Sequence, residues 1–174
     1  MAAILLDRLI PPIIVGLLII MIFRLNGFMM ESQVDNRLSN EMQIFSELAS
    51  TIIQEEMKSA NNIVTLTANS IVYDTIDGIR VTMERVDQQL VIRKVNLDTL
   101  EEIIIEHPTY LSSLEFLAEP TGVPLNEVRF INVKLTAESN PIAHVNFNGD
   151  VETAKAFSER QIYLRNVAAA TLQL

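Results

Sequence analysis

The sequence contains no cysteine and only two histidines among its 174 residues. Without cysteine the chain has no disulfide, no thiolate metal ligand and no thiol nucleophile. The histidines, His107 and His144, lie far apart in the sequence and would need carboxylates from separate segments to complete a zinc site. We therefore expect no bound metal.

Glycine-based motifs are missing as well. The five glycines are scattered and form neither G-x-G-x-x-G nor a P-loop, and no serine lies in a G-x-S-x-G setting. The acidic residues at positions 55–56 and in "EEIIIE" at positions 101–106 are typical of solvated helix surfaces, and no loop has the dense carboxylates of a calcium site. The sequence predicts a protein that is not an enzyme and has no cofactor.

Basic residues are scarce. The chain has 13 Lys and Arg against 22 Asp and Glu, a net charge of −9. Removing residues 1–30 takes away Asp7, Arg8 and Arg24, which leaves 11 basic and 21 acidic residues and a net charge of −10. Such a surface lacks the positive charge that binds nucleic acid and is repelled by anionic lipid headgroups. We therefore expect no nucleic-acid partner.

Apolar residues, in contrast, are abundant at the start of the chain. Residues 10–23 are apolar throughout, and with their neighbours they reach the length of about 20 residues that spans hydrocarbon. Arg24 lies near one end, where its side chain can snorkel to the interface. The segment lacks the basic start and small-residue cleavage site of a signal peptide. We predict that residues 1–30 are a retained transmembrane anchor whose helix begins or bends at Pro11–Pro12.

Residues 31–62 predict an amphipathic helical stem that continues the anchor. No Pro or Gly interrupts residues 28–60, so anchor and stem can form one rod of about 45–50 residues, about 70 Å long, with Gly27 as the expected joint and Asn61–Asn62 as the end. We expect the apolar stripe of the stem to pack on the chain's own sheet rather than in a coiled coil. The stripe has helical spacing: Val34, Leu38, Met42, Phe45, Leu48 and Ile52, widened by Ile53 and Met57.

Residues 63–174 predict a globular domain of short strands. Turn dipeptides such as Asp77-Gly78 and Asn148-Gly149 separate segments rich in β-branched residues, without crossover helices, which favours an antiparallel meander. Residues 96–113 are predicted as a short helix that ends at Pro108, and a slip of the apolar phase at Phe130–Ile131 predicts a bulge. The predicted fold class is α+β, a long N-terminal helix packed on an antiparallel β-meander.

This order of elements resembles that of type IV pilins and of the pseudopilins of type II secretion. The resemblance implies a structural subunit in a bacterial inner membrane, with its C-terminal domain in the periplasm. Three stretches carry the resemblance. The family's hairpin is similar to "SIVYDTIDGIRVTMERVDQQLVIRKV", and its next strand–loop–strand unit is similar to "LSSLEFLAEPTGVPLNEVRFINVKLTAES". The ending of the larger minor pseudopilins is similar to "RQIYLRNVA".

The sequence departs from these families at its start. Gly27-Phe28 with Glu31 has the residue types of the family's cleavage site, but the apolar run precedes this site instead of following it. A better alignment sets Asp7 at the place of the family's helix glutamate, with Ala3 as the first helical residue and almost no leader. The resemblance then implies that Asp7 pairs with a neighbour's N-terminal amine. Alternatively, Asp7 and Arg8 pair with each other or snorkel to the headgroups.

We therefore expect Asp7, Arg8, Gly16 and Arg24 to serve assembly, with Gly16 permitting the close approach of another helix. The expected partners are the lipid bilayer and other single-span pilin-like subunits, or further copies of this chain. The alternative function is a single-pass membrane adaptor or binding module of another envelope assembly. A membrane protein of a virion or phage also fits the sequence.

Overall fold

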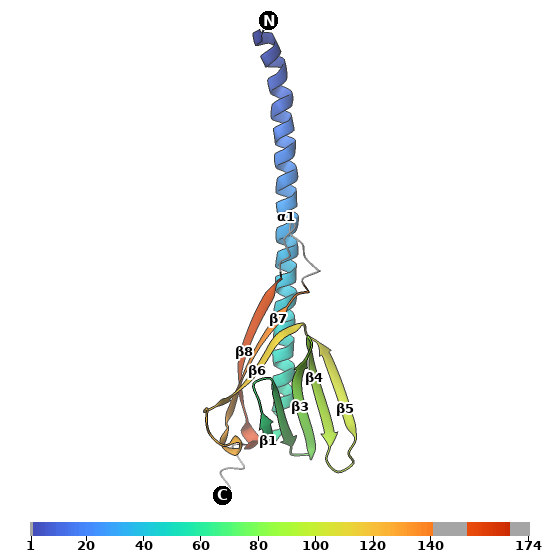
Figure 1. Ribbon diagram of the computed structural model, residues 1–174, viewed down its shortest axis with the longest axis vertical. Coiled ribbons are helices and arrows are strands. Elements are labelled where there is room, and N and C mark those ends of the chain that lie inside the picture. The colour runs from blue at the N-terminus through green and yellow to red at the C-terminus, as the bar shows by residue number, and fades with distance from the viewer. Residues whose placement is uncertain (1, 141–152, 168–174) are drawn as a thin grey trace.

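The computed structural model describes residues 2–140 and 153–167, and for residues 2–9 the backbone alone. In this part of the chain one long helix, α1 (Ala2–Met57), precedes eight strands and the short 3-10 helix η1 (Leu125–Glu127). Figure 1 shows α1 as a stalk that rises from a β-rich domain. The strands are β1 (Ala60–Leu66), β2 (Ser70–Thr75), β3 (Ile79–Val86), β4 (Gln89–Asn96), β5 (Glu102–Pro108), β6 (Leu111–Glu119), β7 (Phe130–Glu138) and β8 (Lys155–Tyr163).

The strands form two antiparallel sheets, each a meander. The first sheet has the order β1-β2-β3-β4-β5 and the second has the order β6-β7-β8. The lower part of α1 packs on β7 and β8. Glu56, near its end, accepts a charged hydrogen bond of 2.8 Å from Nζ of Lys94 on β4. The predicted α+β fold is confirmed, although its strands lie in two sheets instead of one.

The core lies where α1 meets the inner faces of both sheets. β7 buries alternate residues from Ile131 to Ala137, as a strand with one inward face must. From α1 the core receives Ala49, Ile53 and Met57, which recur at helical spacing. The two periodicities therefore converge on one hydrophobic core, to which the first sheet adds Ile63, Ile71, Tyr73, Val81, Met83, Leu90 and Ile92.

α1 is longer than the predicted rod and has no break. It passes Pro11–Pro12 and Gly27 without interruption, so neither the predicted start at the prolines nor the predicted joint divides it. Each proline lacks the N–H of one backbone hydrogen bond and its ring crowds a preceding carbonyl, a cost that apolar spanning helices tolerate. At about 1.5 Å per residue, its 56 residues extend about 84 Å. The helix ends at Met57, and Asn61–Asn62 belong to β1.

Small side chains share the buried face of the stem with large ones. Val34 and Leu48, which were predicted to face the sheet, are 41% and 47% exposed. Small side chains allow a helix and a sheet to approach closely, and a pattern built from large apolar residues does not include them. The buried positions are Met42, Ser46, Ala49, Ser50, Ile53 and Met57.

The helix predicted within residues 96–113 is wrong. This stretch forms a turn, then β5, then the start of β6. Three successive isoleucines, Ile103–Ile105, are stiff at χ1 and favour the extended backbone. β5 pairs with β4 at every position from Gln89↔Pro108 to Val95↔Glu102.

The predicted bulge is also displaced. β7 pairs regularly from Phe130 onward, and the register shift of this sheet lies in β6, between Leu111 and Ser113. The apparent phase slip arises because Val128 is buried just before β7 begins. The predicted turn at Asn148-Gly149 and His144 lie outside the described residues.

Tyr73 on β2 is a fully buried tyrosine beneath the end of α1. Its hydroxyl makes no hydrogen bond of ordinary geometry, although Ser59 and Glu56 lie near it. Burial raises the pKa of the phenol, and the negative charge of Glu56 raises this pKa further. The phenol is therefore held neutral in the folded chain.

The substitution Tyr73→Phe should remove a pH dependence of stability. An exposed tyrosine ionises near its usual pKa of about 10, so above that pH the unfolded chain loses a proton that the folded chain keeps, and the free energy of unfolding falls. At neutral pH we expect the free energy of unfolding of the variant to lie within about 1 kcal/mol of that of the parent. In alkali this free energy should fall less in the variant than in the parent. Denaturant unfolding, at neutral pH and at about one pH unit above the tyrosine pKa, measures the free energy of unfolding of both proteins. An equal loss of this free energy in alkali would contradict the buried, neutral state of Tyr73.

Candidate functional site

The most apolar surface of the chain lies on the upper part of α1. From Ile10 to Met30 its large apolar side chains are 45–72% exposed, on all sides of the helix. Among the described residues this is the one helix long and apolar enough to cross a membrane, and none of its most apolar stretch is buried by the rest of the chain. A helix that is apolar all round needs lipid or protein around it.

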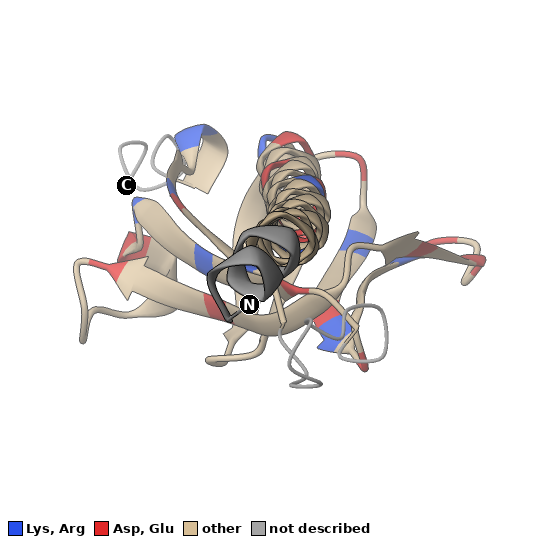
Figure 2. Ribbon diagram, turned by 90° about the horizontal axis from the view of Figure 1, so that it is seen from above, with Lys and Arg blue, Asp and Glu red and all other residues tan. Residues whose placement is uncertain are grey.

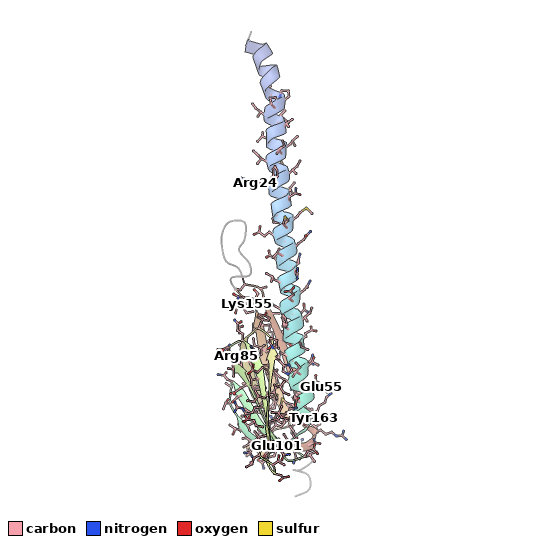
Figure 3. All side chains as sticks on the ribbon, turned by 90° about the vertical axis from the view of Figure 1, so that its right-hand side faces the viewer. Arg24, Glu55, Arg85, Glu101, Lys155 and Tyr163 are labelled. Atoms are coloured by element: carbon pink, nitrogen blue, oxygen red, sulfur yellow. The ribbon has the colours of Figure 1, made fainter. Side chains whose placement is uncertain are left out.

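Arg24 is the charged residue within this surface whose side chain the structure describes. Figure 3 shows it high on α1, far from the domain. Met42, the first buried residue of the stem, follows 18 positions later, about 27 Å along the helix. The guanidinium is exposed, so its long side chain is free to reach a polar layer at one end of the apolar segment.

The four residues predicted to serve assembly all lie on α1, but they are spread along it. Asp7 and Arg8 have helical backbone, and their side chains lie outside the described part of the chain. At Gly16 no atom lies within 4 Å of the place where a Cβ would sit. Nothing in the chain's own fold therefore requires glycine there. The assembly role of these residues stays a prediction.

A second exposed apolar surface follows along the stem. We call it the outer stem face: Val34, Ile44 and Leu48, which are 41%, 64% and 47% exposed and point away from the sheets. Ile44 and Leu48 are four residues apart and so lie next to each other on the helix surface. Between Val34 and Ile44, Arg37 and Glu41 form an exposed ion pair of 2.9 Å.

Sequence reasoning missed the outer stem face because it assigned Val34 and Leu48 to the stripe that packs on the sheet. Ile44 was not part of that stripe. The spacing of four between Ile44 and Leu48, on the side opposite Ala49 and Ile53, is the signal that identifies a second apolar repeat. The stem thus has apolar residues on two sides, and the sheets cover only one of them.

The other charged and polar residues that were considered as site candidates lie in ordinary structural settings. No group of three or more His, Cys, Asp or Glu residues suited to a metal ion occurs in residues 2–140 and 153–167. His107 lies on β5, within the stretch that was predicted as a helix. Glu55 pairs with Lys58 at 2.6 Å on the helix surface. An open polar groove between α1 and β8 has neither histidine nor cysteine among its lining residues, which are Ser39, Gln43, Glu47 and residues 155–158.

Substitutions at two small residues of α1 should distinguish the exposed surface of the helix from the surface that packs on the sheets. Gly16→Leu should not lower the free energy of unfolding, because nothing in the described chain contacts this position and leucine favours the helix more than glycine does. Ala49→Leu should lower it by about 1–3 kcal/mol, because Ala49 is fully buried between the helix and the sheets. Denaturant unfolding in detergent measures both. Equal destabilisation by the two substitutions would contradict the described packing.

Comparison with known proteins adds no family assignment. No family model matches the chain, and no curated protein and no solved structure matches it. The architecture of the chain, a long apolar N-terminal helix followed by antiparallel sheets, is compatible with a pilin-like fold.

Proposed function

We propose that this chain is a non-enzymatic, membrane-anchored structural subunit of the pilin or pseudopilin kind. It assembles with other single-span subunits, or with further copies of itself, in an envelope complex of the secretion or pilus type. The observation that carries the proposal is the continuity of α1. Its upper part is bare and apolar, and its lower part belongs to the core of the domain. One rigid element thus joins a lipid-facing surface to a folded domain.

Lipid is the proposed environment of the upper part of α1. Hydrocarbon covers the apolar side chains between residues 10 and 30, and Arg24 snorkels to the headgroups on the side of the domain. The short N-terminal end lies in the cytoplasm and the domain lies in the periplasm of a bacterium. The acidic surface of the domain suits this arrangement, because it is repelled by anionic headgroups and stays away from the bilayer.

Neighbouring subunits are proposed to contact α1 at two levels. Within the bilayer, Gly16 lets a second helix approach closely, and Asp7 pairs with a neighbour's N-terminal amine. Beyond the bilayer, the outer stem face contacts another stem. Leu48 lies 18 residues past Met30, about 27 Å along the helix and outside the hydrocarbon. Lipid tails do not reach it, so another protein surface is the cover that removes it from water.

Photocrosslinking from a single cysteine tests this assembly. Because the chain has no cysteine, a thiol-reactive benzophenone attaches at one site in Leu48→Cys. Illumination of native membranes should give adducts with the same chain or with another single-span stem protein, identified by mass spectrometry. Glu115→Cys on β6, exposed on the second sheet, is the matched control and should give few adducts.

Two results would count against the assembly. One is a Leu48→Cys chain that stays monomeric after illumination. The other is crosslinking only to a soluble protein, which is the result that the adaptor alternative predicts.

A further inference from the structure

β5 is an open edge of the first sheet. In the described part of the chain its strand neighbour is β4, and no other strand pairs with its outer side. Figure 1 shows β5 at the margin of the domain, away from α1. An unpaired edge presents a row of backbone N–H and C=O groups that can accept another strand.

The register identifies which groups point outward. The N–H of Asn96 donates to the C=O of Glu101 across the turn into β5, and this pair continues the register of β4 and β5. Hydrogen-bonded pairs alternate along antiparallel strands. Residues 103, 105 and 107 therefore bond to β4, whereas the N–H and C=O groups of Glu102, Ile104 and Glu106 point away from the sheet.

Apolar side chains flank these backbone groups on both faces. Ile103 is 60% exposed and Ile104 is 50% exposed. Ile103 and Ile105 share the inner face with Ile92 of β4, which is fully buried, so the apolar surface of the core continues to the edge. Ile104 lies on the other face. A strand added here would bury isoleucines on both of its sides.

The edge is also held in a regular shape. β5 pairs with β4 without a bulge, whereas β1, at the opposite edge, has two register shifts and lies against η1. The turn before β5 is fixed by Asn96, whose side chain accepts hydrogen bonds from the N–H groups of Asp98 and Thr99. A straight, preorganised edge lowers the entropic cost of adding a strand.

Charge identifies the occupant. On the outer face of the sheet Ile104 lies between Glu102, which forms a 3.0 Å ion pair with Arg93 of β4, and the exposed Glu106. Glu101 stands just before the strand (Figure 3). Figure 2 shows acidic residues at this margin of the domain. If β5 paired antiparallel with a second copy so that isoleucines faced isoleucines, Glu102 would oppose Glu106, which is unfavourable. In that register a second copy sets acid against acid, whereas a basic segment matches the charge of the edge.

We propose that the edge of β5 binds an extended segment of a partner protein as an added antiparallel strand, with a basic residue on each side of three apolar residues. One basic residue of the segment pairs with Glu106, and the other shares Glu102 with Arg93. The central residue of the segment exchanges both backbone hydrogen bonds with Ile104. This site goes beyond the proposed assembly through α1, because it lies on a different element and does not require membrane insertion.

The test uses the full chain in detergent and a fluorescent peptide that contains Lys-Val-Val-Val-Lys, with binding followed by anisotropy. The peptide should bind more tightly than its acidic counterpart, Glu-Val-Val-Val-Glu. N-methylation of the central valine, whose N–H faces Ile104, should weaken binding about fivefold. N-methylation of the first valine, whose N–H points away, is the matched control and should change little.

Variants of the chain test the same contacts from the other side. Ile104→Pro removes an outward N–H and no bond to β4, and it should weaken binding about fivefold. Ile104→Thr keeps the N–H and should bind nearly as the parent does. Glu106→Lys should weaken binding, whereas the same substitution at Glu115 on β6 should have little effect. Where Ile104→Pro fails to fold, the pair of N-methylated peptides still decides the question.

Three results would overturn the proposal. The first is equal binding of the basic and acidic peptides, or none of either, which would mean that the glutamates only protect the edge. The second is equal binding of the two N-methylated peptides. The third is a dimer in sedimentation that Ile104→Pro dissociates, which would make a second copy the occupant. Crosslinking through Leu48 is unaffected by Ile104→Pro, so each proposal can fail without the other.

Discussion

The architecture depends on the packing of the last turns of α1 against the sheets. Ala49, Ile53 and Met57 are almost completely buried there. Polar contacts fix the helix on both sides of this packing, since Glu56 pairs with Lys94 of the first sheet and Gln54 accepts a 2.6 Å hydrogen bond from Arg160 of the second. Because the same helix continues without a break to residue 2, whatever surrounds its upper part also sets the orientation of the domain.

One helix thus meets two environments. The sheets cover one side of its lower part, whereas its upper part is apolar all round and is not covered by the described part of the chain. The outer stem face and the β5 edge are two exposed apolar surfaces at which we propose contacts with other proteins. They lie on different elements, so the chain can contact a neighbouring stem and an added strand at the same time.

The sequence predicted the helix, the strands and their antiparallel order because each depends on local periodicity and turns. It did not predict where one sheet ends and the next begins, since hydrogen bonding between distant strands has no local signal. β5 was predicted as a helix because glutamates flank Ile103–Ile105 as they would on a helix surface. These three β-branched residues favour the extended backbone instead. Ala49 and Ser50 were missed because small residues carry little weight in an apolar pattern. For Gly16, the described part of the chain shows no packing that requires a glycine.

The reaction of single cysteines along α1 with a membrane-impermeant maleimide, in native membranes, tests whether lipid surrounds the upper helix and the sheets cover the stem. We expect protection at every position from 10 to about 23, and then a periodic pattern of reaction in the stem. Cysteines at positions 43 and 47, which are exposed and do not belong to the outer stem face, should react, and those at 49 and 53 should react only after the domain is unfolded. Reaction throughout positions 10–23 would show that lipid does not surround the upper helix. Reaction at 49 and 53 in the folded protein would show that the stem does not pack on the sheets.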